Sequence, residues 1–405
     1  MRKGYPTIML KWLLLSLTTG GLVGAAERPA GWRGDGTGSY PSANPIAKWS
    51  EKGNVLWKSE VGAGQSSPVV VNQRVFVTAE PDLLLCLDTE TGRELWRQSH
   101  KFSDLPASLN AKDPGESNQY GDASPTPVSD GKRIWAFYGT GIVACHDLDG
   151  KRAWINWYDL PQTTSYGRTA SPVLVGERLL VHFGALACLE AATGKLLWKN
   201  EQAKATYGTP ALTRIGEVEV VITPKGHIVR VADGKILAAD LGNCMYTSPV
   251  VQDGVVYFMD GTMTAVRLPE KAADVLACEE LWSGEIAGEF YASPLVHDGR
   301  IYVMDKAANY YVLDASTGKT LLNKTLEFPR TDGAKVYPSL CLAGKQLFAS
   351  NDAGDTLLLT PGIQVAVSGT NSLPLGSGAS ATFSGQRMYV RGGKFLYGVG
   401  TNGGR

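Results

Sequence analysis

Several tyrosines recur at a nearly constant distance before a proline in this sequence. Those that stand three residues before it are Tyr207, Tyr246 and Tyr291, and those near equivalent places are Tyr120, Tyr166 and Tyr337. A tyrosine ring can stack on a sugar, a quinone or a peptide while its hydroxyl forms a hydrogen bond. If the chain is a closed repeat, these side chains would line one rim of a central channel. There they either bind such a ligand or pack between neighbouring loops.

Two short motifs could add charge to the same rim. Tyr120-Gly-Asp122 and Tyr166-Gly-Arg168 would bring a carboxylate and a guanidinium near the tyrosines. These two groups either contact a ligand or form an ion pair with each other. The longest connection, residues 98–123, is expected on the same face, where loops held by a rigid scaffold often carry function.

No catalytic or metal-binding motif is evident. The run Asp147-Leu-Asp149-Gly150 resembles part of a calcium loop, but it aligns with an ordinary turn that begins at Asp88 and lacks further ligands. The five histidines show no metal-ligand spacing, and no Gly-x-Ser-x-Gly, phosphate-loop or zinc motif occurs. The sequence therefore predicts no catalytic residue and no metal site, and it favours a non-catalytic protein over an enzyme.

The side chains named above belong to a sequence unit that is repeated along the chain. Residues 83–96, 141–154 and 185–198 are closely similar, and each follows a Ser-Pro or Thr-Pro pair and a short apolar run. The residues that mark the start of each unit are Pro68, Pro127, Pro172, Pro210, Pro249, Pro294, Pro338 and Ala381. Self-similarity at about forty to fifty residues is typical of repeat architectures. Eight units fit the sequence.

Each unit reads as four short strands. In the first unit these are residues 68–71, 74–78, 83–87 and 94–97, with Gly92 in the last turn. Four-stranded antiparallel units repeated eight times predict an all-β, eight-bladed β-propeller.

The two ends of the repeat region are expected to meet. The last unit has only three strands and ends near Val399, whereas residues 54–58 resemble the outer strand at residues 93–97. An N-terminal strand would thus complete the last blade and hide an open sheet edge. The expected organisation is a signal peptide at 1–26, an N-terminal extension at 27–53, the propeller at 54–399 and a polar tail at 400–405.

A tryptophan recurs in the outer strand of five units. These residues are Trp57, Trp96, Trp154, Trp198 and Trp282, while Leu322 stands at this place in the sixth unit and the fourth unit has none. Packing between neighbouring blades is the favoured interpretation, and stacking on a ligand is the alternative.

The six cysteines divide into two groups. Cys86, Cys145 and Cys188 occupy one position in three successive repeats, so they are expected to be buried and unpaired. One disulfide between two of the other three cysteines, Cys244, Cys278 and Cys341, is an alternative that the sequence leaves undecided.

The N-terminal residues have the order of a secretory signal. Arg2, Lys3 and Lys11 precede the apolar run 12–17, and small residues follow at 21–26, so cleavage is expected after Ala26; an uncleaved anchor is the alternative. We therefore expect an exported protein, periplasmic or extracellular, that is not an integral membrane protein after cleavage. Lys plus Arg and Asp plus Glu both number 39, so no net charge favours nucleic acid.

The repeat resembles a known family. Segments of the form Ser-Pro…Leu-x-x-Leu-Asp-x-x-Thr-Gly-x-x-x-Trp, with Gly31-Trp-Arg-Gly34, resemble the pyrroloquinoline quinone (PQQ) repeat of quinoprotein alcohol dehydrogenases and their non-enzymatic exported relatives. The dehydrogenases imply bound PQQ, a calcium or lanthanide ion, a catalytic aspartate and two adjacent half-cystines, and this chain has no adjacent cysteines. Another branch, the propeller subunit of outer-membrane barrel assembly, is a non-catalytic lipoprotein scaffold.

These observations lead to one functional expectation. The chain is expected to be a non-catalytic binding module that uses its tyrosine-lined face for an envelope or extracellular protein or a glycan, without a cofactor. The expected site residues are Tyr120, Asp122, Tyr166, Arg168, Tyr207, Tyr246 and Tyr291. The alternative is a PQQ-dependent or sugar-active propeller enzyme.

Overall fold

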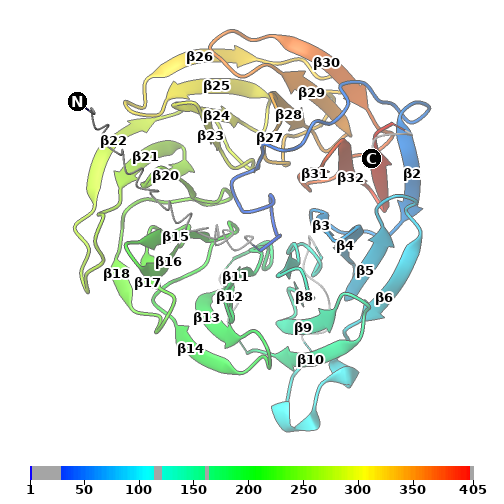
Figure 1. Cartoon of the computed structure of the whole chain (residues 1–405), viewed down its shortest axis with the longest axis vertical. Coiled ribbons are helices and arrows are strands. Elements are labelled where there is room, and N and C mark those ends of the chain that lie inside the picture. Colours follow the sequence, from blue (N-terminus) through cyan, green and yellow to red (C-terminus); the bar gives the residue numbers. More distant parts are fainter. Residues whose placement is uncertain (2–28, 114–120, 160–163, 402–405) are drawn as a thin grey trace.

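Eight sheets, each with four antiparallel blade strands, surround a central axis in the computed structural model, which describes residue 1 and residues 29–113, 121–159 and 164–401 (Figure 1). Seven of the sheets follow one another along the chain, each with its first strand innermost. This arrangement confirms the all-β, eight-bladed propeller. The signal peptide predicted at residues 1–26 lies outside the described residues, apart from residue 1.

The first four blades contain β3 to β18. Their bounds are β3 (Val69–Val71), β4 (Arg74–Ala79), β5 (Leu83–Asp88), β6 (Glu94–Ser99); β7 (Val128–Ser129), β8 (Arg133–Phe137), β9 (Ile142–Asp147), β10 (Arg152–Trp157); β11 (Val173–Val175), β12 (Arg178–Phe183), β13 (Ala185–Glu190), β14 (Leu196–Asn200); β15 (Ala211–Ile215), β16 (Val218–Ile222), β17 (Ile228–Arg230), β18 (Ile236–Ala238). Two 3-10 turns, η1 (Phe102–Asp104) and η2 (Ala107–Leu109), follow the first blade.

The last four blades contain β19 to β33 and two N-terminal strands. Their bounds are β19 (Val250–Gln252), β20 (Val255–Asp260), β21 (Thr262–Arg267), β22 (Glu279–Glu285); β23 (Leu295–His297), β24 (Arg300–Met304), β25 (Asn309–Asp314), β26 (Thr320–Thr325); β27 (Cys341–Ala343), β28 (Gln346–Ser350), β29 (Asp355–Leu359), β30 (Val367–Ser372), with β1 (Ser39–Tyr40); β31 (Thr382–Ser384), β32 (Arg387–Gly392), β33 (Phe395–Val399), with β2 (Val55–Glu60).

The N-terminal strand β2 closes the ring. It pairs antiparallel with β33, so that Val55 lies opposite Val399 and Glu60 opposite Phe395. Figure 1 shows β2 beside the C-terminal strands of the last blade. The predicted closure is therefore confirmed, and the sheet of the eighth blade has its fourth strand.

A belt of hydroxyl groups surrounds the channel at the start of the inner strands. In each blade the backbone N–H of one residue donates to the side-chain hydroxyl of its equivalent in the next blade, at 2.9 or 3.0 Å. The belt residues are Ser67, Thr126, Ser171, Thr209, Ser248, Ser293, Ser339 and Ser380. The eight bonds form a closed cycle, which satisfies backbone donors that are buried beside the channel.

The belt corrects one repeat marker. In six blades the belt residue directly precedes the marker proline, and Ser380 directly precedes Ala381, but in the seventh blade Pro338 comes before Ser339. The residue equivalent to the marker is therefore Leu340. A proline can stand on either side of the belt position because the inner strand begins only at Cys341, so neither place removes a strand hydrogen bond.

The outer-strand tryptophans join neighbouring blades, as predicted. Each indole N–H donates to a backbone carbonyl in the last turn of the next blade at 2.9 or 3.0 Å. In that turn a glycine with positive φ lies against the ring, and a Cβ on it would come within 2.4 to 2.7 Å of ring carbons. The tryptophan–glycine pairs are Trp57–Gly92, Trp96–Gly150, Trp154–Gly194, Trp198–Gly234 and Trp282–Gly318.

Replacing Gly194 with alanine should lower the free energy of unfolding by about 3 kcal/mol, because the residue has φ +74° and its Cβ would lie 2.7 Å from Trp154. The matched control is Gly176→Ala in the same blade, where φ is +54° but no atom lies within 4 Å of the added Cβ. The control should cost only about 1 kcal/mol. Urea unfolding of both variants measures the difference, and equal losses would contradict the tryptophan–glycine contact.

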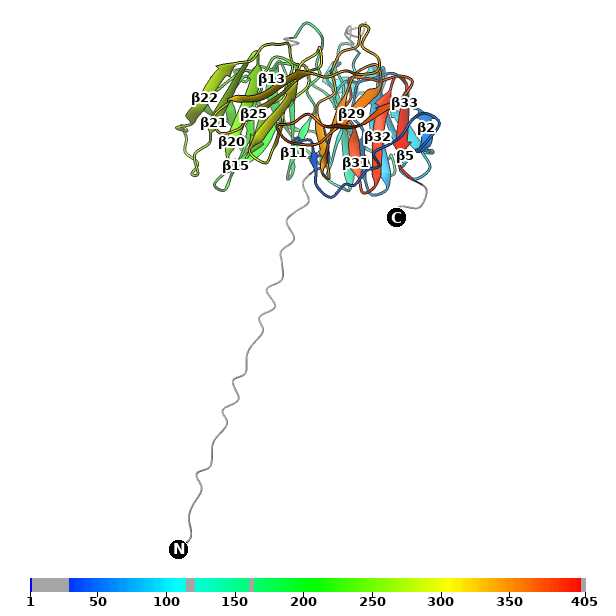
Figure 2. The same ribbon diagram turned by 90° about the horizontal axis from the view of Figure 1, so that it is seen from above.

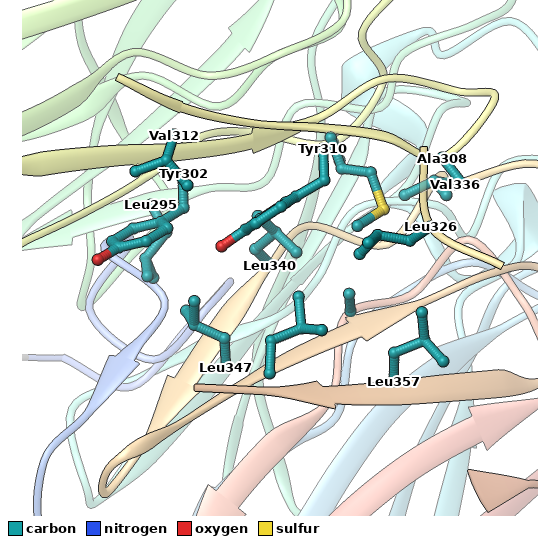
Figure 3. Close-up of a cluster of buried hydrophobic side chains, with 14 of the residues drawn as sticks. Leu295, Tyr302, Ala308, Tyr310, Val312, Leu326, Val336, Leu340, Leu347 and Leu357 are labelled. Carbon is teal, nitrogen blue, oxygen red and sulfur yellow. The ribbon is translucent and has the colours of Figure 1, made fainter. Parts of the chain in front are cut away.

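The hydrophobic core lies between blades rather than at the centre. Figure 3 shows one cluster in which Tyr302 and Tyr310 of the sixth blade face Leu347 and Leu357 of the seventh. All six cysteines are free; five are buried, and Cys278 is partly buried. The unpaired state predicted for Cys86, Cys145 and Cys188 is confirmed, and no disulfide forms among the other three.

The N-terminal segment crosses the channel on the face opposite the connections between blades. Ala30 exchanges backbone hydrogen bonds with Ser129 at the end of β7, and β1 pairs parallel with β27. Between them the fully buried Arg33 donates to the carbonyls of Pro294 and Leu340, at 3.1 and 2.8 Å. Figure 1 shows this segment inside the ring, and Figure 2 shows it along one face of the molecule.

The described part of the chain has no helix with the length and apolarity needed to cross a bilayer.

Candidate functional site

Five tyrosines form a continuous arc on the face that carries the connections between blades. The ring centroids of consecutive members lie 5.9, 5.3, 5.0 and 4.8 Å apart. The members, here called the tyrosine arc, are Tyr166, Tyr207, Tyr246, Tyr291 and Tyr337. The structure thus brings together four of the predicted site residues and adds Tyr337.

The belt explains why the arc is continuous. Each of the last four arc tyrosines stands two residues before a belt residue, so these rings follow the same circle around the channel mouth. The equivalent positions in the other four blades hold Gln65, Ser124, Thr169 and Gly378. The mouth therefore has one aromatic half, at blades 3 to 7, and one half with small or polar side chains.

The rings of the arc partly cover one another, so their faces are not fully open to a ligand. Tyr291 and Tyr337 are stacked with an interplanar angle of 5°, and Tyr207 and Tyr246 with one of 19°. Tyr166 is 41% exposed, and the other four rings are partly exposed. Because part of each ring's face is used by its neighbour, the arc is pre-formed and loses little rotamer freedom on binding.

A charged pair supports Tyr291, the fourth tyrosine of the arc. Tyr291 donates its hydroxyl proton to Glu289 at 2.7 Å, and Lys306 in the sixth blade pairs with the same carboxylate. The hydrogen bond from Lys306 lowers the pKa of Glu289, so the carboxylate stays charged and holds the tyrosine hydroxyl. Partial burial and this carboxylate raise the pKa of Tyr291 above its ordinary value.

Asp122 and Arg168 lie near each other, with Asp122 buried and Arg168 partly exposed. Gly139 connects them, because its N–H donates to the Asp122 carbonyl at 2.8 Å and its own carbonyl accepts from Arg168. Burial lowers the pKa of Arg168, and the charge of Asp122 opposes this shift. Arg168 also lies over the Phe183 ring at 5.7 Å. Both charged residues therefore support the loops beneath the rim, while Tyr120 lies outside the described residues.

The long connection at residues 98–123 extends outward from the ring in its described part. Asp104, at the end of η1, pairs with Arg152 of β10 at 3.3 Å, and Phe102 and Leu105 pack against the core between the first two blades. Figure 1 shows η1 and η2 beyond the outer edge of the ring near β10. In this part the insertion lies at the perimeter rather than over the channel mouth.

The residues present do not fit the metal site that quinoprotein dehydrogenases imply. Among the described residues no group of three or more His, Cys, Asp or Glu side chains is placed to hold a metal ion. Asp147 accepts N–H groups from Asp149 and Lys151 at 3.0 and 2.9 Å, as a turn residue does.

Comparison with known proteins shows the family. A family model described as outer membrane protein assembly factor BamB matches residues 44–268, more than half of the chain. The chain belongs to the BamB family. The match covers β2, blades 1 to 4 and three strands of the fifth blade, and it contains Tyr166, Tyr207 and Tyr246. The predicted membership of the PQQ-like propeller superfamily is thereby confirmed.

Individual relatives are distant. Outer membrane protein assembly factor BamB from Yersinia pestis is 25% identical over 265 residues, which cover 57% of this chain and 61% of that protein. BamB from Burkholderia pseudomallei is 29% identical over 156 residues, 36% of this chain and 38% of that protein. The aligned part of this chain thus spans less than two thirds of each of these relatives.

Solved structures share the fold. BamB from Moraxella catarrhalis superposes with a TM-score of 0.57 at 12% identity, covering 86% of this chain and 99% of that one. A europium-containing methanol dehydrogenase superposes with a TM-score of 0.58 at 14% identity and covers 89% of both chains. Because BamB and a methanol dehydrogenase are equally similar to this chain, the fold alone does not identify the function.

Sequence reasoning missed two parts of the site. Tyr337 was placed only near an equivalent position because Pro338 served as the marker, whereas counting from the hydroxyl residue Ser339 gives its register directly. The Glu289–Lys306 pair had no signal in the sequence, because its members lie 17 residues apart on different loops.

Proposed function

We propose that this chain is a non-catalytic scaffold of the bacterial envelope that binds a partner protein with its tyrosine arc. The observation that carries the proposal is the arc itself: five tyrosines from five successive blades, with centroids 4.8 to 5.9 Å apart on one face. Tyrosine is enriched at protein interfaces because it offers a large rigid ring together with a hydroxyl.

A protein is favoured over a glycan as the ligand of the arc. The rings of Tyr291 and Tyr337 stack on each other, so the arc offers a broad ridge of ring edges and hydroxyls rather than one open ring face for a sugar. The relatives are named outer membrane protein assembly factors, which supports a role in assembling envelope proteins. The proposal needs no cofactor.

An exported, periplasmic location accompanies this proposal. The names of the relatives refer to outer membrane assembly, which supports a location in the envelope and gives no support to an extracellular one. The tyrosine arc would then face the partner, while residues 29–40, on the opposite face, lie away from it.

Replacing both Tyr207 and Tyr246 with alanine should remove the partner without unfolding the protein. The two rings are partly exposed and contribute to the middle of the arc, and central aromatic residues dominate interfaces, so at least about a tenfold loss of affinity is expected. Blue-native electrophoresis of mildly solubilised envelopes measures whether the chain moves with a larger complex.

The control for this experiment is a pair of exposed apolar residues on other elements, Leu197 and Leu212, both replaced with alanine. The control should keep the wild-type mobility, whereas the double tyrosine variant should move as a free chain while its circular dichroism shows that it is folded. If the tyrosine variant keeps the complex, the arc is not the binding surface. Binding of the arc to a purified glycan instead of a protein would also contradict the proposal.

A further inference from the structure

The fourth blade is shorter than its neighbours at the face that carries the tyrosine arc. Its third and fourth strands, β17 and β18, have three residues each, whereas β13 and β14 of the third blade have six and five. The strand register shows what is missing: Ala238 pairs with Ile228 as Trp198 pairs with Cys188. Alanine thus stands where five other blades have tryptophan, and the outer strand ends at this residue.

The chain after β18 folds back over its own blade instead of covering the next one. Asp240 adopts φ 58°, and the N–H groups of Leu241 and Cys244 donate to the carbonyls of Gly226 and Pro224, at 3.2 and 2.7 Å. The start of β21 in the fifth blade is therefore covered only in part: Thr262 is exposed, whereas Thr264 is buried. A cavity of about 450 Å³ occupies this space between blades 4 and 5, and its polar lining residues are Lys225, Asp240, Asn243, Asp260, Thr262 and Thr264.

The lining is polar where equivalent positions are apolar. Thr264 lies opposite Ser283 of β22, one position before the residue paired with the outer-strand tryptophan. Leu85 of β5 and Leu357 of β29 hold the equivalent position in the first and seventh blades, and both are buried in the core. Only Val266, farther along the same face of β21, packs in the apolar core against the fourth blade. Thr262 and Thr264 thus place hydroxyl groups at the end of β21 that borders the cavity.

A chain of hydrogen bonds holds the polar groups in place. Lys225 Nζ donates to Asn243 Oδ1 at 2.9 Å, Asn243 Nδ2 donates to Asp260 Oδ2, and the hydroxyls of Thr264 and Ser283 lie 3.1 Å apart. This network fixes the amide and leaves donors on Lys225 and acceptor capacity on Asp260 for a ligand. Burial raises the pKa of Asp260 from its usual value, and the charge of Lys225 opposes the shift.

The mixture of charges restricts the class of ligand. Two carboxylates would repel an anion, and the ammonium of Lys225 would repel a cation bound among them. An apolar ligand would leave these groups without hydrogen-bond partners. The hydroxyl groups of a sugar both donate and accept, so they can pair with lysine, aspartate, asparagine and threonine together. The volume is in the usual range for small-molecule sites.

We propose that the cavity between blades 4 and 5 is a binding site for a neutral sugar of one or two rings. This ligand and site are separate from the partner protein and the tyrosine arc, although Tyr246 lies three residues after Asn243 on the same connection. The site gives the propeller a second, small-molecule ligand beside its protein-binding face.

The test uses the full-length protein and a panel of neutral monosaccharides and disaccharides, including hexoses and N-acetylhexosamines. Saturation-transfer NMR and calorimetry should detect binding of at least one sugar to the wild type. Asp260→Asn and Thr264→Leu should each weaken it at least about tenfold, the first by removing a charged acceptor and the second by filling the cavity as Leu85 does in the first blade.

Two matched controls keep the test specific. Asp253→Asn and Thr320→Leu make the same changes at exposed positions of the fifth and sixth blades, outside the cavity, and should bind as the wild type does. Circular dichroism and melting temperatures check that all variants fold. Absence of binding across the panel, or equal binding by cavity and control variants, overturns the proposal. The two proposals fail separately, because sugar binding is measured on the purified protein, whereas the partner protein is detected in solubilised envelopes.

Discussion

Replacing Trp57 with alanine should lower the free energy of unfolding by about 4 kcal/mol, a large loss for a single substitution. The side chain is only 8% exposed, and it packs on Gly92 and donates its indole N–H to the Thr89 carbonyl at 3.0 Å. The variant would lose this hydrogen bond and leave a cavity between the last and first blades. That interface is the one at which the ring closes, because β2 comes from the N-terminal end of the propeller.

Trp198→Ala provides the comparison within the same fold. Trp198 makes the equivalent contacts with Gly234 and the Val231 carbonyl, but its side chain is partly exposed and its strand is continuous with its own blade. Its replacement should cost about 3 kcal/mol. Chemical unfolding followed by tryptophan fluorescence and circular dichroism gives both values. A Trp57 variant as stable as the wild type would show that β2 does not close the ring.

Acidification should destabilise the protein through buried histidines. His182 is 2% exposed and its Nε2 lies 2.9 Å from the Ala203 carbonyl. Burial lowers the pKa of His182 from 6.5 to about 4, because the imidazolium is poorly solvated inside the blade. The unfolded chain therefore binds a proton that the folded chain excludes. The contribution of His182 to the free energy of unfolding is fully present above pH 6.5. It is lost as the pH falls toward 4, and the loss amounts to about 3 kcal/mol.

The paired histidines between the first two blades act in the same direction. His100 and His146 are buried, and their Nε2 atoms lie 2.8 Å apart. Burial lowers the pKa of His100 to about 4 and also lowers the pKa of His146. Two positive charges at this distance would repel each other, so this interface adds to the loss of stability below pH 6.5.

Unfolding midpoints measured between pH 7.5 and 4 test this prediction. His182→Leu should lose less stability than the wild type over this range, because the group that takes up the proton is absent. His297→Gln, which replaces a partly exposed histidine, is the comparison variant. Identical pH profiles for His182→Leu and the wild type would contradict the assignment of this acid sensitivity to buried imidazole.

The fold could be predicted because its determinants are local and repeated. The turn glycine and the outer-strand tryptophan stand four residues apart in one blade, as Gly194 and Trp198 do. The glycine contacts the tryptophan of the preceding blade, and the tryptophan contacts the glycine of the following blade. One repeat therefore contains both residue types that form the contact between blades. Ring closure was equally visible, because β2 has the sequence of an outer strand and the last unit lacks one.

The candidate site could be predicted only in part. Equivalent repeat positions placed Tyr207, Tyr246 and Tyr291 side by side, but the contacts of Asp122 and Arg168 with Gly139 depend on how three loops pack. The cavity between blades 4 and 5 left a trace in the sequence, the missing tryptophan of the fourth unit, but its depth depends on the backward turn at Asp240. Loop directions of this kind are set by tertiary contacts rather than by spacing.

Site-specific photo-cross-linking in living cells would show whether the tyrosine arc is the partner-binding surface. A photoreactive phenylalanine analogue placed at position 246, in the arc, should give a single cross-linked partner protein. The same analogue at position 253, in the β19–β20 turn on the opposite face, should give none. Cross-linking at position 253 but not at position 246 would show that the partner binds the opposite face and not the tyrosine arc.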